Sequence, residues 1–216
     1  MVDIDHEDQH DRMKKVLKIL VVGDMGTGKT SLIRQYVHGF FSEFYRSTIG
    51  VDFAHKDIQW GDNLLINLQL WDISGQERFG SVTHMYYQEA VGAMIVFDVT
   101  VPQNLNVVQI WKKDIDSKVF TTEDKPIPCL LIGNKIDLVP DGWEKSKEEM
   151  EQFCQENGFI GYFETSAREA INVSEANEFL MKYIIDHDIH PMHPNELDQC
   201  IDIKNDSNKS NNGCCH

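Results

Sequence analysis

A glycine-rich octapeptide occupies residues 23–30 and reads Gly23-Asp24-Met25-Gly26-Thr27-Gly28-Lys29-Thr30. It matches the pattern G-x-x-x-x-G-K-[ST]. A β-branched apolar run at residues 16–22 precedes it, and apolar residues at helical spacing over residues 30–37 follow it. Small residues let backbone N–H groups curl around phosphate oxygens, and the positive end of the following helix points at the same place. The pattern predicts a phosphate-binding loop, and its context disfavours the alternative of a plain tight turn.

Outward from this loop, strand-like and helix-like segments alternate along the chain. Strands are expected at residues 16–22, 52–60, 64–71, 93–99, 127–132 and 160–165, and helices at residues 30–37, 105–119, 144–157 and 173–185. The turn Gly61-Asp62-Asn63 joins the second and third strands as a hairpin. The alternation predicts an α/β fold: a doubly wound, mostly parallel six-stranded sheet with one antiparallel edge strand.

The composition narrows the class of protein. Of the 216 residues, 20 are Lys or Arg and 35 are Asp or Glu, which gives a formal charge of −15 and argues against a nucleic-acid partner. No apolar run reaches the length of roughly 18 residues that a membrane span needs. The five cysteines are irregularly spaced, as in a reduced cytosolic chain. We expect a flexible acidic arm at residues 1–13, one domain at residues 14–187 and a disordered tail at residues 188–216.

A second motif follows the strand expected at residues 127–132 and reads Asn134-Lys135-Ile136-Asp137. A carboxylate at Asp137 can accept hydrogen bonds from the ring N–H and the exocyclic amine of guanine together, a donor pair that adenine lacks. The aliphatic stem of Lys135 can lie over a base or over the phosphate loop. Ser166 and Ala167 follow the next strand at the same sheet edge, where small side chains let backbone N–H groups approach the base.

A third group of residues follows the strand at residues 64–71. Asp72 at a strand end can hold Mg²⁺ through water, Gly75 can offer its N–H to a γ-phosphate, and Gln76 can orient an attacking water. Thr48 and Thr30 can add hydroxyl ligands to the metal, and Lys29 can place its charge on the outer phosphates. Singly, each residue also fits ordinary turn chemistry; their order along the chain favours nucleotide hydrolysis.

Over residues 16–185 the sequence resembles the Ras superfamily of small GTPases. The stretches Ile49-Gly50-Val51-Asp52-Phe53 and Trp71-Asp72-Ile73-Ser74-Gly75-Gln76-Glu77-Arg78-Phe79 are similar to the Rab branch, and the run at residues 51–54 with the apolar Met25 is similar to its subgroup of lysosome-related organelles. The resemblance implies the small GTPase fold with GTP or GDP and Mg²⁺ as ligands. The catalytic residues that it implies are Gln76 and Lys29, and the Mg²⁺ ligands are Thr30, Thr48 and Asp72. The residues that it implies to contact the nucleotide are Gly26, Thr27, Gly28, Lys29, Thr30, Ser31, Phe41, Thr48, Gly75, Asn134, Lys135, Asp137, Ser166 and Ala167.

The same resemblance implies partners. Phe41 would pack edge-on against guanine, and effector proteins would read an aromatic patch of Phe53, Trp71 and Tyr86. Phe53 and Trp71 fall on the two hairpin strands, so they are expected as cross-strand neighbours, with hairpin core packing as the alternative. Further implied partners of the monomer are an exchange factor, a GTPase-activating protein, a prenylation escort and a GDP-dissociation inhibitor.

Two residues depart from the family pattern and bear on hydrolysis. Met25 replaces a smaller residue of the phosphate loop and can crowd the space of Gln76, and Ser74 replaces the usual Ala before Gly75. We expect slow turnover without an activator, because no Arg of the motifs resembles a built-in finger. The alternatives are a GTP-loaded binding module that hardly hydrolyses, and a P-loop small-molecule kinase, against which the Asn134–Asp137 motif speaks.

The last three residues, Cys214-Cys215-His216, predict a membrane anchor. Two geranylgeranyl chains on Cys214 and Cys215 would meet the need for two signals, whereas a reactive or metal-binding thiol pair is the alternative. Residues 195–213 carry four acidic residues against two lysines, so the tail does not add a basic signal. The expected location is the cytoplasmic face of intracellular membranes, with endosomal, lysosome-related or phagosomal membranes favoured, and a cytosolic pool.

Overall fold

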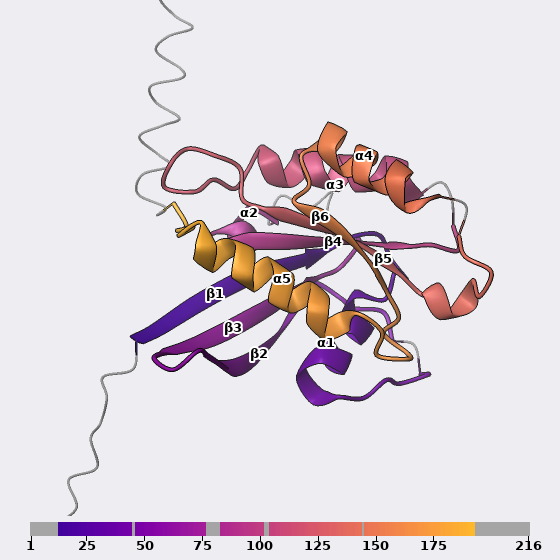
Figure 1. Ribbon diagram of the computed structural model, residues 1–216, viewed down its shortest axis with the longest axis horizontal. Coiled ribbons are helices and arrows are strands. Elements are labelled where there is room, and N and C mark those ends of the chain that lie inside the picture. Colours follow the sequence, from indigo (N-terminus) through magenta and orange to yellow (C-terminus); the bar gives the residue numbers. More distant parts are fainter. Residues whose placement is uncertain (1–12, 45, 77–82, 102–103, 144, 193–216) are drawn as a thin grey trace, which may run out of the picture.

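The computed structural model describes residues 13–44, 46–76, 83–101, 104–143 and 145–192. Its strands are β1 (Met13–Val22), β2 (Val51–Trp60), β3 (Leu64–Ile73), β4 (Gly92–Asp98), β5 (Cys129–Asn134) and β6 (Gly161–Thr165). They form one six-stranded sheet in the order β2-β3-β1-β4-β5-β6 (Figure 1). β2 runs antiparallel to β3, and every other neighbouring pair is parallel. The predicted doubly wound sheet with one antiparallel edge strand is confirmed.

Helices cover both faces of the sheet because the central strands are apolar on both sides. The α-helices are α1 (Lys29–His38), α2 (Thr83–Tyr87), α3 (Asn104–Asp116), α4 (Lys147–Asn157) and α5 (Val173–Asp186), with a short 3₁₀-helix η2 (Ile136–Leu138). Leu17 and Ile19 of β1 pack in a core cluster with α1 and α5, whereas Leu20 and Val22 pack in a second cluster with α2, α3 and α4. Successive side chains of a strand point to opposite faces, which explains this division of β1.

Several boundaries differ from the sequence-based expectation for local reasons. α4 begins at Lys147 rather than at residue 144, because Ser146 caps it: the Ser146 hydroxyl accepts from the Glu149 amide, and the Glu149 carboxylate accepts from the Ser146 amide. Gly158 ends this helix with a φ of 69°, as expected. The short α2 was not predicted, since five residues are too few for a helical period to show in the sequence.

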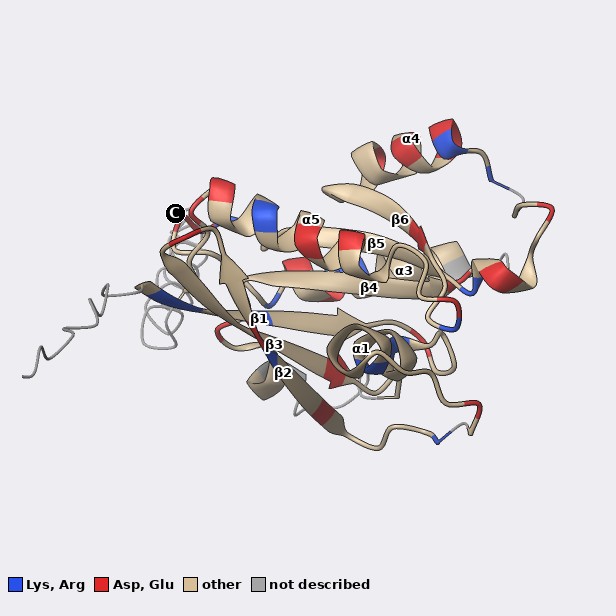
Figure 2. Ribbon diagram, turned by 60° about the horizontal axis from the view of Figure 1, so that its bottom comes forward, with Lys and Arg blue, Asp and Glu red and all other residues tan. Residues whose placement is uncertain are grey.

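Both ends of the expected domain extend further than predicted. Met13, expected in the acidic arm, is the first residue of β1 and donates its amide to Asn63. Residues 188–192, expected in the tail, pack against the domain: Pro191 forms an isolated β-bridge with Thr121, and Met192 is buried. Within the described residues, no helix has the length and apolar character needed to cross a bilayer. Figure 2 shows acidic residues spread over α4 and α5, in keeping with the net negative charge.

Candidate functional site

A cavity of about 280 Å³ opens at the carboxyl edge of the parallel strands. It lies where doubly wound sheets bind their ligands, between the loop after β1 and the loops after β5 and β6. Twelve of the predicted nucleotide contacts line it: Gly26, Gly28, Lys29, Thr30, Ser31, Phe41, Thr48, Gly75, Asn134, Lys135, Asp137 and Ala167. Four further predicted residues do not line the cavity themselves but form the hydrogen bonds described below: Thr27, Asp72, Gln76 and Ser166.

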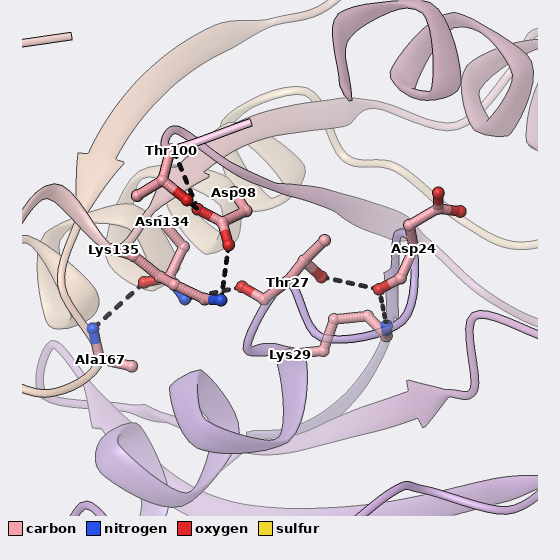
Figure 3. Close-up of polar contacts among 8 residues, drawn as sticks. All are labelled: Asp24, Thr27, Lys29, Asp98, Thr100, Asn134, Lys135 and Ala167. Carbon is pink, nitrogen blue, oxygen red and sulfur yellow. Dashed lines mark hydrogen bonds and ion pairs between the residues drawn. The ribbon is translucent and has the colours of Figure 1, made fainter. Parts of the chain in front are cut away.

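The loop between β1 and α1 holds a buried cation. The Lys29 ammonium group donates to the carbonyl oxygen of Gly23 at 2.9 Å and to that of Asp24 at 2.8 Å, the second of which Figure 3 shows. The Thr27 hydroxyl donates to the same Asp24 carbonyl at 3.0 Å, which ties the loop into a closed turn. Burial lowers the pKa of Lys29 to about 8, with the nearby Asp72 and Asp24 carboxylates acting in the opposite direction. An anion in the cavity would stabilise this charge.

Three oxygen-bearing side chains converge below the mouth of the loop. The Thr30 and Thr48 hydroxyl oxygens lie 2.8 Å apart, the Thr48 hydroxyl donates to Asp72 Oδ2 at 3.3 Å, and the Thr30 hydroxyl donates to the same carboxylate oxygen. Asp72 Oδ1 is buried without a hydrogen-bond partner, and burial raises the pKa of this carboxyl group. Hydroxyl and carboxylate oxygens with one unsatisfied acceptor fit a small hard cation such as Mg²⁺, which keeps several waters and phosphate oxygens as its other ligands.

The other end of the cavity is organised by Asn134, which is 1% exposed. Its amide nitrogen donates to the Thr27 carbonyl at 2.9 Å, and its amide oxygen accepts from the Ala167 amide at 3.2 Å (Figure 3). The same oxygen accepts from the Thr165 hydroxyl at 3.2 Å. One side chain thereby joins the loops after β1, β5 and β6. Gly28 is required beneath it, since a Cβ there would collide with the Asn134 amide nitrogen.

Asp137 lies at the same end, in the 3₁₀-helix after β5. Its Oδ1 accepts from the Ser166 hydroxyl at 2.6 Å, so the carboxylate is held in place by the loop after β6. The Ser166 hydroxyl also accepts from the Glu169 amide at 3.0 Å. The carboxylate lines the cavity. The predicted base-recognition residues are therefore brought together at one end of the cavity, and the predicted phosphate residues at the other.

Asp98 at the end of β4 has a structural role here that the sequence analysis missed. The Lys135 ammonium group pairs with Asp98 Oδ2 at 2.5 Å, while Asp98 Oδ1 accepts from the amide and the hydroxyl of Thr100 (Figure 3). Lys135 adopts a left-handed backbone conformation with a φ of 73°. The carboxylate thus fixes the side chain of Lys135, which lines the cavity. The sequence did offer one indication of this role, because Asp98 lies near the carboxyl end of the strand expected at residues 93–99.

Met25, which departs from the family pattern, lies between two segments near the phosphate end. Its sulfur is 3.9 Å from the Ser47 hydroxyl and 4.0 Å from the Gln76 amide nitrogen. A Cβ at Gly75 would collide with the backbone of Met25 and Asp24, so this close approach needs glycine. The backbone N–H of Gln76, as distinct from this side-chain nitrogen, donates to the Ser74 hydroxyl at a long 3.4 Å. Gln76 therefore contacts the side chain that was expected to crowd it.

The expected aromatic patch lies on the outer strands. Phe53 and Trp71 are direct cross-strand partners of β2 and β3, and their rings stack with centroids 5.8 Å apart. Phe53 is 59% exposed, whereas Trp71 is half-buried beneath the Lys18 ammonium group at 3.7 Å. Tyr86 is half-buried against the second core cluster. Cys214 and Cys215, the predicted lipidation sites, lie outside the described residues.

The cavity also has wall residues that the motifs do not contain: Arg34, Ser42, Glu43, Phe44, Arg46, Ser47, Leu138 and Arg168. Most of them belong to the segment between α1 and β2, whose sequence has no regular period. Among them, Glu43 and Arg168 form an ion pair across the base end of the cavity, with Arg168 Nη2 3.0 Å from Glu43 Oε1. Their 125-residue separation in sequence left no signal for this pair.

A cavity of this composition, at this edge of a doubly wound sheet, defines a P-loop nucleotide-binding protein. Comparison with known proteins gives the family. The model of the Ras family matches residues 18–186. The Rab-32A protein of Dictyostelium discoideum is 54% identical over 180 residues, covering 83% of this chain and 82% of that protein. Human Rab-32 is 46% identical over 202 residues, covering 93% of this chain and 89% of that protein.

A third relative, Rab-7L1 of Rattus norvegicus, is 46% identical over 172 residues, covering 80% of this chain and 83% of that protein. The chain therefore belongs to the Ras family of small GTPases, within its Rab branch and the group that contains Rab-32 and Rab-7L1. Like the other members of this family, it hydrolyses GTP.

Proposed function

We propose that this GTPase is a Mg²⁺-dependent molecular switch of membrane trafficking, which binds GTP and GDP in the cavity described above. The observation that carries the proposal is the position of Asp137, whose carboxylate lines the base end of the cavity and is oriented by Ser166. A carboxylate in this place accepts from the ring N–H and the exocyclic amine of guanine and rejects adenine, which has no such donor pair. Asn134 keeps the surrounding loops at a fixed distance.

The phosphate end would hold the triphosphate by charge and by backbone N–H groups. Gly26, Thr27, Gly28 and Lys29 bring their amides to the phosphates, Lys29 adds its ammonium group, and Thr30 and Ser31 begin the helix whose positive end faces them. Thr30, Thr48 and Asp72 would hold Mg²⁺. When bound, Mg²⁺ neutralises charge on the β- and γ-phosphate oxygens. Phe41 closes the base end from the side.

Hydrolysis in this site is slow without an activating protein. Gln76 orients the attacking water, Gly75 donates its N–H to the γ-phosphate, and Lys29 stabilises the charge that develops on the outer oxygens. Gln76 competes for its position with Met25, because the two side chains are in contact. An arginine supplied by a partner contributes on the order of 10³–10⁵ in rate in this class of reaction. A GTPase-activating protein is therefore an expected partner.

The switch acts through the segments that hold Thr48 and Gln76. Thr48 as a ligand of Mg²⁺ and Gly75 as a donor to the γ-phosphate would order both segments in the GTP state, and loss of the γ-phosphate would release them. Effector proteins bind one state better through the aromatic patch of Phe53, Trp71 and Tyr86, and only this difference in affinity transmits a signal. An exchange factor restores the GTP state. The exposed ring of Phe53, stacked on Trp71, supports this assignment.

The membrane function depends on the tail. Two geranylgeranyl chains on Cys214 and Cys215 would anchor the monomer, since a single lipid gives only marginal attachment. An escort protein would present the chain for prenylation, and a GDP-dissociation inhibitor would maintain a cytosolic pool. Residues 14–187, extended by the packed residues 188–192, would form the GTPase domain that this tail tethers. Membranes of endosomes, lysosome-related organelles or phagosomes are the proposed location, on their cytoplasmic face.

The test is nucleotide binding by the full-length chain. The bound ligand is extracted from purified protein, and GDP, GTP and ATP are then titrated with Mg²⁺. We expect guanine nucleotides only, and at least about tenfold weaker GDP binding by Asp137→Asn, because a charge-assisted hydrogen bond contributes roughly 1.5–3 kcal/mol. Asp141→Asn, an exposed aspartate four residues further on, is the matched control and should bind as the wild type does. Equal binding of ATP would overturn the proposal in favour of a P-loop kinase.

A further inference from the structure

The segment between α1 and β2 begins and ends at glycines in the left-handed region. Gly39 has a φ of 69° and Gly50 a φ of 72°, and open space surrounds the position of a Cβ at each. Between them, the described residues 40–44 and 46–49 include several that line one side of the cavity, and Thr48 is bonded to Thr30 and Asp72 at the phosphate end. We call this segment the strap, because it forms one side of the cavity and is connected to the rest of the wall by side-chain contacts.

Besides the 3.9 Å contact of the Ser47 hydroxyl with the Met25 sulfur, side chains of the described part of the strap bind the rest of the wall in two places that differ in chemistry. Thr48 binds the Thr30 hydroxyl and the Asp72 carboxylate, which are the proposed Mg²⁺ ligands. Glu43 binds Arg168 instead, with Arg168 Nη2 3.0 Å from Glu43 Oε1. The first fastening is coupled to the metal and the phosphates, whereas the second is an ion pair between two protein side chains.

Arg168 lies between two residues whose backbone amides are held by hydrogen bonds. It follows Ala167, whose amide is held by the Asn134 side chain, and its Nε lies 3.7 Å from the Glu169 carboxylate. Glu43 lies on the strap, two residues after Phe41. Both partners line the cavity, and their side chains are 50% and 75% exposed. The pair thus connects the loop after β6, which Asn134 holds, to the strap.

We propose that the Glu43–Arg168 ion pair is a nucleotide-retaining contact, which closes the base end of the cavity and slows the release of GDP and of GTP to the same extent. This inference rests on the proposed guanine-nucleotide function. A bound nucleotide leaves only when the strap opens, and opening separates Glu43 from Arg168. Because this fastening contains neither metal nor phosphate, its contribution is the same for both nucleotides, unlike that of Thr48.

The exposure of both side chains sets the size of the effect. Exposed ion pairs contribute little, and breaking one corresponds to a change of about two- to fivefold in an equilibrium or rate constant. Their attraction is screened by salt, with a Debye length of about 10 Å at 0.1 M and about 3 Å at 1 M. A modest, salt-sensitive increase in release rate is therefore the expected signature.

The test measures the dissociation of tritium-labelled GDP and of a labelled non-hydrolysable GTP analogue from the full-length chain with Mg²⁺. Glu43→Arg and Arg168→Glu should each release both nucleotides about two- to fivefold faster at low salt. The double variant Glu43→Arg with Arg168→Glu restores an ion pair of opposite orientation and should return both rates toward wild type. Lys182→Glu, which breaks the exposed Lys182–Asp186 pair of α5, is the matched control and should leave both rates unchanged.

Each outcome bears on one claim. Rescue in the charge-swapped variant, together with loss of all differences at 1 M salt, supports the ion-pair strap. Faster release in both single variants without rescue overturns it, because independent damage at two sites then explains the rates. Single variants that release GDP as the wild type does also overturn it, while their retained guanine binding leaves the proposed function intact. A wild-type chain that binds no guanine nucleotide contradicts the proposed function itself.

Discussion

The two ends of the cavity are built in opposite ways. At the base end, Asn134 has both its amide atoms in hydrogen bonds with protein groups, and Asp137 is held by Ser166. At the phosphate end, burial lowers the pKa of Lys29 and raises the pKa of Asp72, and one oxygen of Asp72 has no partner. The base end is complete within the protein, whereas the phosphate end holds charges that the protein alone compensates only in part.

This difference assigns separate tasks to the two ends. Groups that are already paired and fixed recognise a ligand by shape and by the direction of hydrogen bonds, because they need no rearrangement on binding. Groups whose charged forms are disfavoured by burial are stabilised most when a ligand of opposite charge binds beside them. A nucleotide with Mg²⁺ brings such charges only to the phosphate end. We therefore expect the base end to contribute selectivity and stability of the fold, and the phosphate end to contribute the dependence on pH, metal and phosphate number.

Replacing Asn134 should break the base end with the largest effect on stability. Asn134→Ala removes three hydrogen bonds of a buried side chain and leaves the Thr27 carbonyl and the Ala167 amide without their partner. The free energy of unfolding should fall by about 2–4 kcal/mol, since each buried group left unsatisfied costs roughly 1–3 kcal/mol. Urea unfolding in EDTA without nucleotide measures this directly.

Asn67→Ala is the matched control for this change. Asn67 donates to Asp57 and accepts from Gln69 on the outer strands, where we expect water to replace the lost bonds. Its cost should stay under about 1 kcal/mol. Equal costs for the two variants would show that the base end is not the completed network that the hydrogen bonds describe, and the contrast between the two ends would lose its basis.

The sequence predicted this architecture well, and the reason is local. The loop at residues 23–30, the strand ends and the hairpin turn each specify their structure within a few residues, so the sheet and the cavity edge could be derived from them. The capping box of Ser146 and Glu149 is also visible in the sequence and indicates a helix that begins at Lys147. The start predicted from the helical period alone lies three residues earlier. By contrast, α2 is shorter than a readable helical period.

Long-range polar contacts could not be derived in the same way. Asp98 meets Lys135 because β4 and β5 are neighbours in the sheet, and Glu43 meets Arg168 across a segment without any period. The Asn134 network likewise joins loops whose separations along the chain are set only by the folded sheet. Motifs therefore identified residues that face the cavity. The partners that orient these residues depend on the folded sheet and could not be predicted from the motifs.

At the phosphate end, the lowered pKa of Lys29 gives a pH dependence with a definite sign. Burial holds this pKa at about 8 in the free protein, and bound phosphates raise it, so binding takes up a proton at pH values above 8. GDP affinity should be constant up to about pH 7 and about tenfold weaker at pH 9. Titration calorimetry at pH 8.5 in two buffers of different ionisation enthalpy should report uptake of a substantial fraction of a proton.

The control for this prediction keeps the charge and removes the titration. Lys29→Arg carries a guanidinium group that stays protonated throughout this range, so its affinity profile should be flat between pH 7 and pH 9. If the wild-type chain takes up no proton at pH 8.5, then the charge of Lys29 is already compensated in the free protein, which contradicts our description of the phosphate end.

Met25 offers a way to sharpen the contrast, because it acts only at the phosphate end. Its sulfur contacts Gln76 and Ser47, so Met25→Gly frees Gln76 to approach the water. Single-turnover hydrolysis should be roughly fivefold faster, since small errors in the position of a reacting group are costly in rate. Met25→Leu conserves the volume and should hydrolyse GTP at the wild-type rate. An unchanged rate in Met25→Gly would remove crowding as the cause of slow turnover, while GDP affinity should be the same in all three proteins.

Ser74 has the smallest expected effect, although it also departs from the family pattern. Its hydroxyl accepts from the backbone N–H of Gln76 at 3.4 Å, which is at the limit of a useful hydrogen bond. A bond this long contributes at most about 0.5 kcal/mol, so Ser74→Ala should change the single-turnover rate by no more than about twofold. The sign distinguishes two roles: a slower variant means that Ser74 steadies Gln76, and a faster one means that it holds Gln76 away from the water. Combining Ser74→Ala with Met25→Gly tells whether these two residues act on Gln76 independently, because independent effects multiply in rate.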